Sequence, residues 1–178
     1  MELVEPSVEY KDSFIAAVKE FFPDGTTKPR NPDAFYERFS IAELESSFDA
    51  LLEYARDRRE GRNLPEGRVP STDYWLVDNG EFIGRVNIRH RLTEHLQEIG
   101  GQIGYDIRPS KRRQGYGKKI LQLAVQKAKE LGVERVRITC DADNVPSRKI
   151  IEKNGGVFDS SIPNPENGVD KLRYWIDV

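Results

Sequence analysis

The segment of this 178-residue sequence best suited to chemistry is basic and contains glycine; it runs from Arg112 to Lys119 as Arg-Arg-Gln-Gly-Tyr-Gly-Lys-Lys. Because it lies between an extended stretch and an amphipathic one, we expect it to begin a helix. Amides in the first turn of a helix have no partner inside the helix, and glycine carries no side chain that keeps an anion away. The helix dipole and the neighbouring cations favour the same ligand. The segment predicts a phosphate-binding site; the alternative is a solvated helix start whose glycines only fit a turn.

Two common phosphate-binding motifs do not describe this segment. The Walker A spacing GxxxxGK[ST] is absent, and Gly117 is followed by Lys118, Lys119 and Ile120 instead of the last glycine of a GxGxxG motif. Binding of a nucleoside triphosphate or a dinucleotide is therefore less favoured.

Few other residues suggest metal or nucleophilic chemistry. Cys140 is the single cysteine and ends an apolar strand face. No histidine stands at a spacing that would indicate a catalytic Cys–His pair, so we interpret Cys140 as a core residue. One cysteine also excludes an intramolecular disulfide and a multi-thiolate zinc site. His90 lies on the apolar face of its strand, where a packed, hydrogen-bonded histidine is expected. We predict no metal ion.

Composition argues against several classes of protein. The 28 Lys and Arg are balanced by 30 Asp and Glu, which gives a formal net charge of -2 and no general electrostatic case for nucleic acid. Six local cations keep nucleic-acid phosphate open as a weaker alternative: Arg108, Lys111, Arg112, Arg113, Lys118 and Lys119. No run of about 18 apolar residues and no signal peptide is present. We expect a cytoplasmic protein with no nucleic-acid or membrane partner.

Helical periodicity fills the N-terminal third. Phe14, Ala17, Val18 and Phe21 share one helical face, and the segment Pro23-Asp24-Gly25 is expected to end this helix. A second apolar stripe predicts one longer helix over Ile41–Glu60. Residues 61–72 hold two glycines and two prolines among polar residues, which is typical of a surface connection.

The rest of the chain changes to the periodicity of strands. Residues 74–77 and 81–91 are β-prone and are joined by Asp78-Asn79-Gly80, which predicts a tight hairpin. Alternation over 81–91 predicts a strand with one buried and one solvated face. We expect further strands over 102–107, 135–140 and 172–178, an amphipathic helix over 120–131 that ends at Gly132, and a short helix over 144–154. Strand, helix and strand in this order indicate a βαβ crossover and an α/β fold.

Two motifs in this region resemble those of one superfamily. Arg112-x-x-Gly115-x-Gly117, after the extended residues 103–109, resembles the acyl-CoA-binding motif of the GNAT N-acetyltransferase superfamily. Asn144 with Ser147, followed by Ile-Ile-Glu-Lys-Asn-Gly-Gly over 150–156, is similar to its second signature. The resemblance covers about Tyr74 to Asp159 and points to a branch of bacterial acetyltransferases with uncharacterised substrates.

The resemblance implies a fold and a division of labour. The fold is α/β, with a mixed, mostly antiparallel sheet, a βαβ crossover and helices on both faces. Residues 1–178 would form one acyl-CoA N-acyltransferase domain, in which 1–73 lie on the acceptor side and 74–178 form the cofactor-binding core.

The resemblance also implies which residues bind acetyl-CoA. Backbone groups of Tyr105, Asp106 and Ile107 would pair with the pantetheine arm as an added strand would. The pyrophosphate would be held by the segment of Arg112, Arg113, Gln114, Gly115, Tyr116, Gly117 and Lys118. Asn144 would hydrogen-bond the cofactor arm with help from Ser147, although an asparagine there is also a good N-cap for the next helix.

Acetyl transfer to an amine needs proton transfers. A lysine-like amine with a pKa of ~10.4 is protonated at neutral pH and must lose a proton before it attacks a thioester. Our candidates for catalytic residues are Glu98, His95 and Tyr105, and a strand amide near Tyr105 could stabilise the oxyanion. In many GNAT enzymes a tyrosine seven residues after the asparagine protonates the leaving thiolate, and this position is Ile151 here. Gln102 stands where many relatives in this branch have a histidine.

Two functions follow from these observations. One is acetyl transfer from acetyl-CoA to a primary amine of a small molecule or peptide by direct attack. The other is a non-catalytic acyl-CoA-binding sensor or assembly module, because the usual acid position is apolar. Acidic residues in the N-terminal part modestly favour a cationic acceptor. We expect a monomer, or a homodimer formed through an exposed sheet edge at the C-terminal strand.

Overall fold

The computed structural model describes residues 1–23, 38–165 and 167–178. The helices in this part of the chain are α1 (Lys11–Phe21), α2 (Ile41–Ser46), α3 (Phe48–Glu60), α4 (Tyr116–Glu130) and α5 (Val145–Lys153). The strands are β1 (Glu2–Val4), β2 (Ser71–Asp78), β3 (Glu81–Arg89), β4 (Ile103–Ile107), β5 (Arg135–Asp141), β6 (Val157–Ile162) and β7 (Lys171–Asp177). Short helical turns are η1 (Val8–Tyr10), η3 (Leu96–Gly100), which is a turn of π-helix, and η4 (Pro109–Lys111).

The first sheet is antiparallel, with strand order β1-β2-β3-β4. The predicted hairpin joins β2 to β3: Asp78 pairs with Glu81, and Asn79 and Gly80 have φ angles of 49° and 76°. Positive φ at both central residues is the geometry that an Asn-Gly turn favours. Strand β1 was not predicted, because three residues are too short to show a periodicity.

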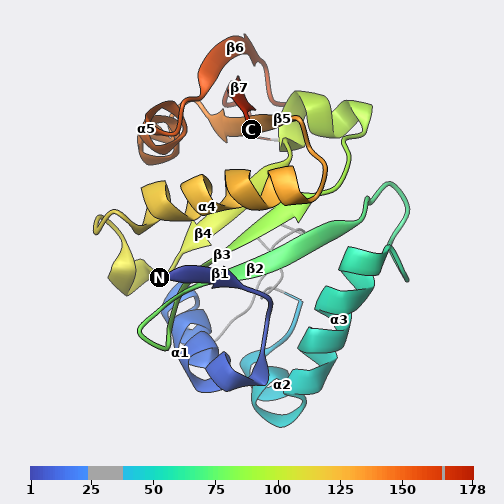
Figure 1. Ribbon diagram of the computed structural model, residues 1–178, viewed down its shortest axis with the longest axis vertical. Helices are drawn as coiled ribbons and strands as arrows, with labels where there is room; N and C mark the ends of the chain where they lie inside the picture. Colours follow the sequence, from blue (N-terminus) through green and yellow to red (C-terminus); the bar gives the residue numbers. More distant parts are fainter. Residues whose placement is uncertain (24–37, 166) are drawn as a thin grey trace.

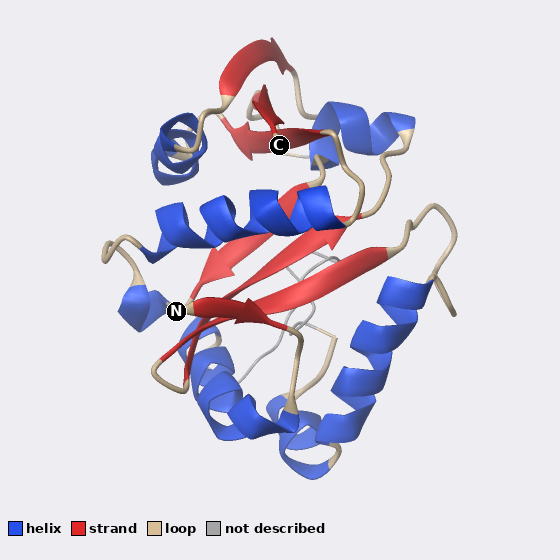
Figure 2. Ribbon diagram, in the orientation of Figure 1, coloured by secondary structure: helices blue, strands red, loops and turns tan. Residues whose placement is uncertain are grey.

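Helices cover both faces of this sheet, with α4 on one face and α1, α2 and α3 on the other (Figures 1 and 2). Ile120, Leu121 and Ala124 of α4 pack in one core, whereas Phe14 of α1 stacks on Trp75 of β2 in a second core. The α/β fold with helices on both faces is therefore confirmed.

The expectation of a solvated face on β3 is wrong. Arg85 and Asn87 are only 4% and 5% exposed, because they face the side of the sheet that the N-terminal helices cover. A β-bulge opposite Leu76 and Val77 also shifts the register, so that Phe82 joins the core of α1 instead of sharing a face with Val86.

The predicted helix over Ile41–Glu60 is two helices that break at Ser47. A capping box begins α2, in which Ser40 and Glu43 bond reciprocally. The hydroxyl of Ser46 donates a hydrogen bond to the carbonyl of Ala42. Serine side chains that bond to the backbone in this way compete with the hydrogen bonds of a regular helix. The break lets Leu44 and Phe48 both reach the core.

The second sheet is antiparallel, with strand order β5-β7-β6. The C-terminal strand β7 is therefore central, and the expectation that it forms an exposed edge is wrong. The edges are β5, which faces β4, and β6, where Val157 and Phe158 are 63% and 54% exposed.

The two sheets meet where β4 and β5 begin and separate beyond that point. The amide of Gln102 donates to the carbonyl of Arg137 at 2.6 Å, and the amide of Arg137 donates to the Gln102 side-chain oxygen at 3.3 Å. The predicted β4-α4-β5 unit is present, but its two strands belong to different sheets. The divergence leaves facing strand edges that a ligand can enter.

Candidate active site

The loop before α4 has the geometry of an anion cradle. Gly115 caps the helix with a φ of 88°, and Arg113 is also left-handed with a φ of 60°. A Cβ atom built on Gly115 would meet nothing within 4 Å, so the space in front of the first helical amides is open. An anion placed there would reach those amides and the positive end of the helix dipole.

The loop is fastened to α1 and to the β2–β3 hairpin by ion pairs. Glu20 accepts bonds from Arg108 Nε at 2.6 Å and from the amide of Ser110 at 2.9 Å. Glu81 binds both Arg108 and Lys111. Two of the six cations named for nucleic-acid binding thus have carboxylate partners, and this weakens that alternative.

Gly117 has a packing role that the sequence did not reveal. A Cβ atom at this position would lie 2.6 Å from Cδ1 of Ile150, where α4 crosses α5. Glycine at 115 leaves room for a ligand, whereas glycine at 117 also lets two helices approach each other.

A narrow cavity of about 220 Å³ lies between β4 and β5, and we call it the slot. Bonds from Arg89 N to Gln102 O and from Arg108 N to Ile83 O show that even-numbered β4 residues pair with β3. By the alternation of antiparallel pairing, the backbone groups of Tyr105 and Ile107 point away from β3 and toward β5. The backbone of Asp106 points to β3, which corrects its predicted place on the cofactor edge. The carbonyl of Ile107 accepts a bond from Arg112 Nε at 3.1 Å.

The far wall of the slot is the beginning of α5. Asn144 is the N-cap of this helix, and its side-chain oxygen accepts the amide of Ser147 at 3.1 Å, as the capping interpretation predicted. The hydroxyl groups of Tyr105 and Ser147 lie 3.1 Å apart and join β4 to α5 across the slot. Burial raises the pKa of Tyr105 to about 12, so its hydroxyl keeps its proton at neutral pH.

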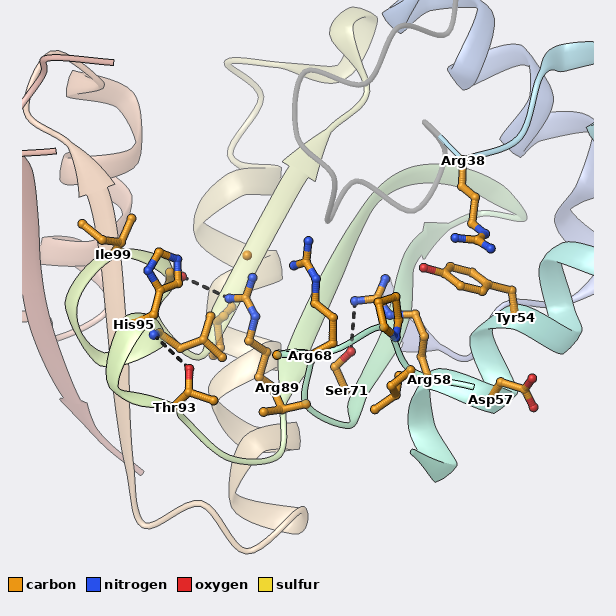
Figure 3. A pocket seen from close by; sticks show the side chains of 18 of the residues that line it. Arg38, Tyr54, Asp57, Arg58, Arg68, Ser71, Arg89, Thr93, His95 and Ile99 are labelled. Carbon is orange, nitrogen blue, oxygen red and sulfur yellow. Dashed lines mark hydrogen bonds between the residues drawn. The ribbon is translucent and has the colours of Figure 1, made fainter. Parts of the chain in front are cut away.

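A larger cavity of about 1090 Å³ adjoins the slot, and we call it the acceptor cavity. Its walls come from α3, the segment 62–71, the end of β3 and the turn η3 (Figure 3). Several residues line both spaces, which therefore meet: Arg89, Ile103, Gly104, Thr139, Asp141 and Lys171.

The three predicted catalytic residues are not brought together. Tyr105 lines the slot, and His95 lines the acceptor cavity (Figure 3). Glu98 is exposed on η3 and is absent from the lining of both cavities.

Sequence reasoning missed a buried polar cluster on β2 and β3. Asp73 is 2% exposed and lies between Arg85, at 3.4 Å, and Arg58, at 3.6 Å. Next to it, Asn87 is buried on the wall of the slot, and neither polar atom of its side chain has a hydrogen-bond partner among the described residues. The alternating polar residues Arg85, Asn87 and Arg89 were the sequence signal for this cluster, but alternation of this kind also predicts a solvated strand face.

Comparison with known proteins decides the family. The family model described as an acetyltransferase (GNAT) domain matches residues 16–157, well over half of the chain. The chain belongs to the GNAT acetyltransferase family. The match begins much nearer the N-terminus than the resemblance at Tyr74, and it confirms the superfamily and an acyltransferase enzyme.

Relatives and solved structures agree with this assignment. The uncharacterized N-acetyltransferase YnaD of Bacillus subtilis (strain 168) is 26% identical over 163 residues, which cover 79% of this chain and 94% of YnaD. The microcin C7 self immunity acetyltransferase MccE, solved with acetyl-CoA and AMP, is 17% identical with a TM-score of 0.66, and the match covers 99% of this chain and 91% of MccE. Mycobacterium smegmatis RimJ, solved with CoA-disulfide, is 16% identical with a TM-score of 0.69, over 99% and 81% of the two chains.

The position at which many GNAT enzymes have the tyrosine that protonates the leaving thiolate is occupied here by Ile151, a core residue. Ile151 is fully buried beside Gly156, whose Cβ atom would lie 2.4 Å from the Ile151 side chain. Ser147 stands one helical turn earlier on the same face of α5, and Tyr105 reaches it from β4. A tyrosine hydroxyl therefore does reach the start of α5 in this protein, but it comes from β4.

Three other residues have structural environments. His90 Nε2 lies 2.8 Å from the hydroxyl of Thr72, and burial, with the charge of Arg59, lowers the pKa of His90, as expected for a packed histidine. Burial raises the pKa of Cys140 to about 11, which fits a core thiol. Gln102 links the two sheets.

The described residues form neither a membrane-spanning helix nor a cluster of metal ligands. Within 1–23, 38–165 and 167–178, no helix is both long and apolar enough to cross a membrane. The same residues contain no group of three or more His, Cys, Asp or Glu arranged to hold a metal ion.

Proposed function

We propose that this GNAT enzyme transfers the acetyl group of acetyl-CoA to a primary amine by direct attack within a ternary complex. The observation that carries the proposal is the continuity of the site: the slot between β4 and β5 opens into the acceptor cavity, and the anion cradle stands at the start of α4. Acetyl-CoA would supply an activated acyl group, and MccE, which shares the fold, was solved with that molecule.

The cofactor would be held mainly by backbone groups. The loop from Arg112 to Lys118 would bind the pyrophosphate, since its open space and positive φ angles suit an anion. The outward-facing edge of β4 at Tyr105 and Ile107 would bind the pantetheine arm as a neighbouring strand does. Asn144 and Ser147 would close the other side.

Tyr105 would act as the acid. When the amine nitrogen bonds to the thioester carbon, the carbon–sulfur bond breaks and the thiolate needs a proton. Tyr105 lines the slot, and its hydroxyl is protonated at neutral pH, as in an ordinary tyrosine; burial, which raises its pKa to about 12, extends that range to higher pH. Ser147, at 3.1 Å, would orient it.

The acceptor amine would form a hydrogen bond with Asn87, and its proton would pass to a base that lines the acceptor cavity. The buried side chain of Asn87 has an acceptor oxygen and a donor nitrogen that find no partner in the part of the chain the structure describes, and a substrate amine could bond to the oxygen. His95 is the predicted base that lines the acceptor cavity. Glu98 is not carried into the proposal, because its exposed side chain does not line either cavity.

Release of free CoA from acetyl-CoA tests the proposal. The purified protein is incubated with polyamines, amino acids, aminoglycosides and short peptides, thiol release is followed, and product masses are checked. An increase in mass equal to one acetyl group on an amine supports it. Binding of acetyl-CoA by calorimetry with no turnover of any acceptor would favour the sensor function instead.

A further inference from the structure

Two glycines lie inside the paired strands β3 and β4, and close packing requires only one of them. A Cβ atom built on Gly84 would lie 2.4 Å from the carbonyl oxygen of Asp106. A Cβ atom built on Gly104 would have no described atom within 4 Å. Gly104 is also absent from the glycines with positive φ, so its extended backbone suits other residues equally well. Neither packing nor backbone conformation therefore explains glycine at position 104.

Gly104 lies where the two cavities join. It lines both the slot and the acceptor cavity, and it is exposed although the preceding residue, Ile103, is only 3% exposed. Glycine inside a strand costs stability and often marks a place where a ligand approaches the backbone closely. The bare backbone at Gly104 is therefore suited to ligand contact at the point where the thioester and the amine would meet.

The cross-strand neighbour of Gly104 lines the same junction. The register of the sheet pairs Gly104 with Asn87 and Asn87 with Asp73, so these three residues form one row across β4, β3 and β2. Side chains directly opposite each other in an antiparallel pair normally touch, because their Cβ atoms are about 4.5–5.5 Å apart. Since Gly104 has no side chain, the Asn87 amide is not covered from β4 and lines the slot. Its two polar atoms have no hydrogen-bond partner within residues 1–23, 38–165 and 167–178.

We propose that Gly104 determines acceptor specificity, because the open space above it receives the substituents on the carbon atom that carries the acceptor amine. The inference rests on the proposed function. When the amine nitrogen is hydrogen-bonded to the oxygen of Asn87, the next carbon atom of the acceptor lies above Gly104, the direct cross-strand partner of Asn87. A side chain at position 104 would fill this volume. Glycine leaves room for an amine on a branched carbon, such as the α-amine of an amino acid amide or of a peptide.

A series of acceptors that differ only at this carbon tests the inference. Glycinamide, alaninamide and valinamide carry the same charge and have zero, one and three extra carbon atoms there, and tripeptides that begin with the same three residues and continue as Gly-Gly form a second series. We expect wild-type kcat/KM for the valine member of a series to be within about 10-fold of that for the glycine member or above it. A preference for the glycine member of more than about 10-fold, or for the unbranched amine spermidine over both series, would overturn the inference.

The variant Gly104→Ala links this tolerance to one position. The added methyl group should lower kcat/KM for valinamide at least about 10-fold, which is the usual effect of one misplaced methyl group, and should change the value for glycinamide by less than about 3-fold. Gly132→Ala is the control, because it also adds a Cβ atom in open space but lies outside both cavities. It should leave the ratio of the two values unchanged. An equal effect of Gly104→Ala on both amides would count against the inference.

Thermal unfolding of Gly104→Ala separates a role in specificity from a role in folding. Alanine fits the extended backbone at this position and has less conformational freedom than glycine in the unfolded chain, so the midpoint of unfolding should stay equal or rise. A higher midpoint together with poorer use of valinamide would support the inference. A lower midpoint would mean that folding requires glycine at 104, and it would overturn the inference.

A binding measurement distinguishes failure of this inference from failure of the proposed function. If no amine is acetylated although acetyl-CoA binds, the proposed function fails, and glycinamide and valinamide are titrated calorimetrically into the protein saturated with CoA. Binding of valinamide that Gly104→Ala weakens about 10-fold, with glycinamide unchanged, would still support an acceptor space above Gly104. Equal effects on the two amides, or no binding of either, would overturn it.

Discussion

The slot and the acceptor cavity adjoin each other but are built from different parts of the chain. The cradle and the cofactor edge of the slot are mainly backbone, from the loop before α4, the outward edge of β4 and the capped start of α5, and side chains such as Tyr105 and Asn87 complete the slot. The acceptor cavity consists of long side chains from α3, the segment 62–71, β3 and η3. A backbone site needs consecutive residues of particular types, whereas a side-chain site is assembled from segments distant in the sequence. Only the first kind is recognisable as a motif.

The difference extends to electrostatics. Partial charges of amides and a helix end would bind the cofactor, and these charges vary little with the residue types around them. Full charges of guanidinium groups line the acceptor cavity, and a single substitution changes them. Acceptor specificity can therefore change while cofactor binding stays the same.

The largest expected effect concerns the wall behind the acceptor cavity. Asp73→Ala removes the buried carboxylate that Arg58 and Arg85 share, and loss of one partner of a buried pair costs about 3–5 kcal/mol. Chemical denaturation should show this fall in the free energy of unfolding. Glu45→Ala removes an exposed pair with Lys19 and should cost no more than about 1 kcal/mol. Similar losses would mean that Asp73 does not brace this side.

The next largest effect is expected on binding of acetyl-CoA at the cradle. Gly115→Ala places a Cβ atom in the open space of the cradle, and the dissociation constant for acetyl-CoA should rise about 10- to 100-fold. Gly132→Ala is the matched control at the other end of α4. The φ angles of Gly132 and Gly115 are 81° and 88°, so alanine would be similarly strained at both positions, and a Cβ atom at Gly132 also meets nothing within 4 Å. The two variants should lose similar stability. Equal acetyl-CoA affinity in both would remove the cradle from the site.

A smaller effect is expected where the two sides meet. Tyr105→Phe should lower kcat about 10- to 100-fold with little change in acetyl-CoA affinity. Because burial raises the pKa of Tyr105 to about 12, ionisation of this group should not reduce the wild-type rate below about pH 11. Tyr74→Phe is the control, a partly buried tyrosine outside both cavities whose pKa burial also raises. A wild-type rate retained by Tyr105→Phe would exclude the acid role.

The smallest effect is expected at Asn87, on the stability of the protein and on KM for the acceptor. Asn87→Leu removes two buried polar atoms that have no partner within residues 1–23, 38–165 and 167–178, so the protein should become more stable by about 1 kcal/mol while KM for the acceptor rises. Asn154→Leu should do the opposite to stability, because the Asn154 amide donates to the carbonyls of Ile150 and Lys118. Thermal unfolding and steady-state kinetics measure both. Destabilisation by Asn87→Leu would mean that its amide is satisfied in the folded protein.

Correct predictions came from interactions between neighbours in the chain. The turn at Asn79 and Gly80, the end of α4 before Gly132 and the cap at Asn144 each depend on a few consecutive residues. The loop geometry at Gly115, with its positive φ, likewise follows from residues adjacent in the sequence. These features depend on φ angles and on hydrogen bonds within one turn, which the residue types decide.

Errors came from interactions between segments. The alternation on β3 was interpreted as a solvated face, but the N-terminal helices cover it and bury Arg85 and Asn87. The stripe over 41–60 gave no sign that a break at Ser47 packs better than a straight helix. Glu98 is close to β4 in sequence, but the π-turn of η3 directs it to solvent.

The family, most of the helices and strands and the glycine-containing loop before α4 were thus readable in the amino-acid sequence, because glycine, capping residues and hydrophobic period act over one or two turns. The separation of β4 from β5, the central place of β7 and the charged wall of the acceptor cavity were decided by tertiary structure. Each depends on how the sheets and helices of the described chain bury their apolar faces together, and that packing is what brings Arg58, Arg68 and Arg89 to one cavity.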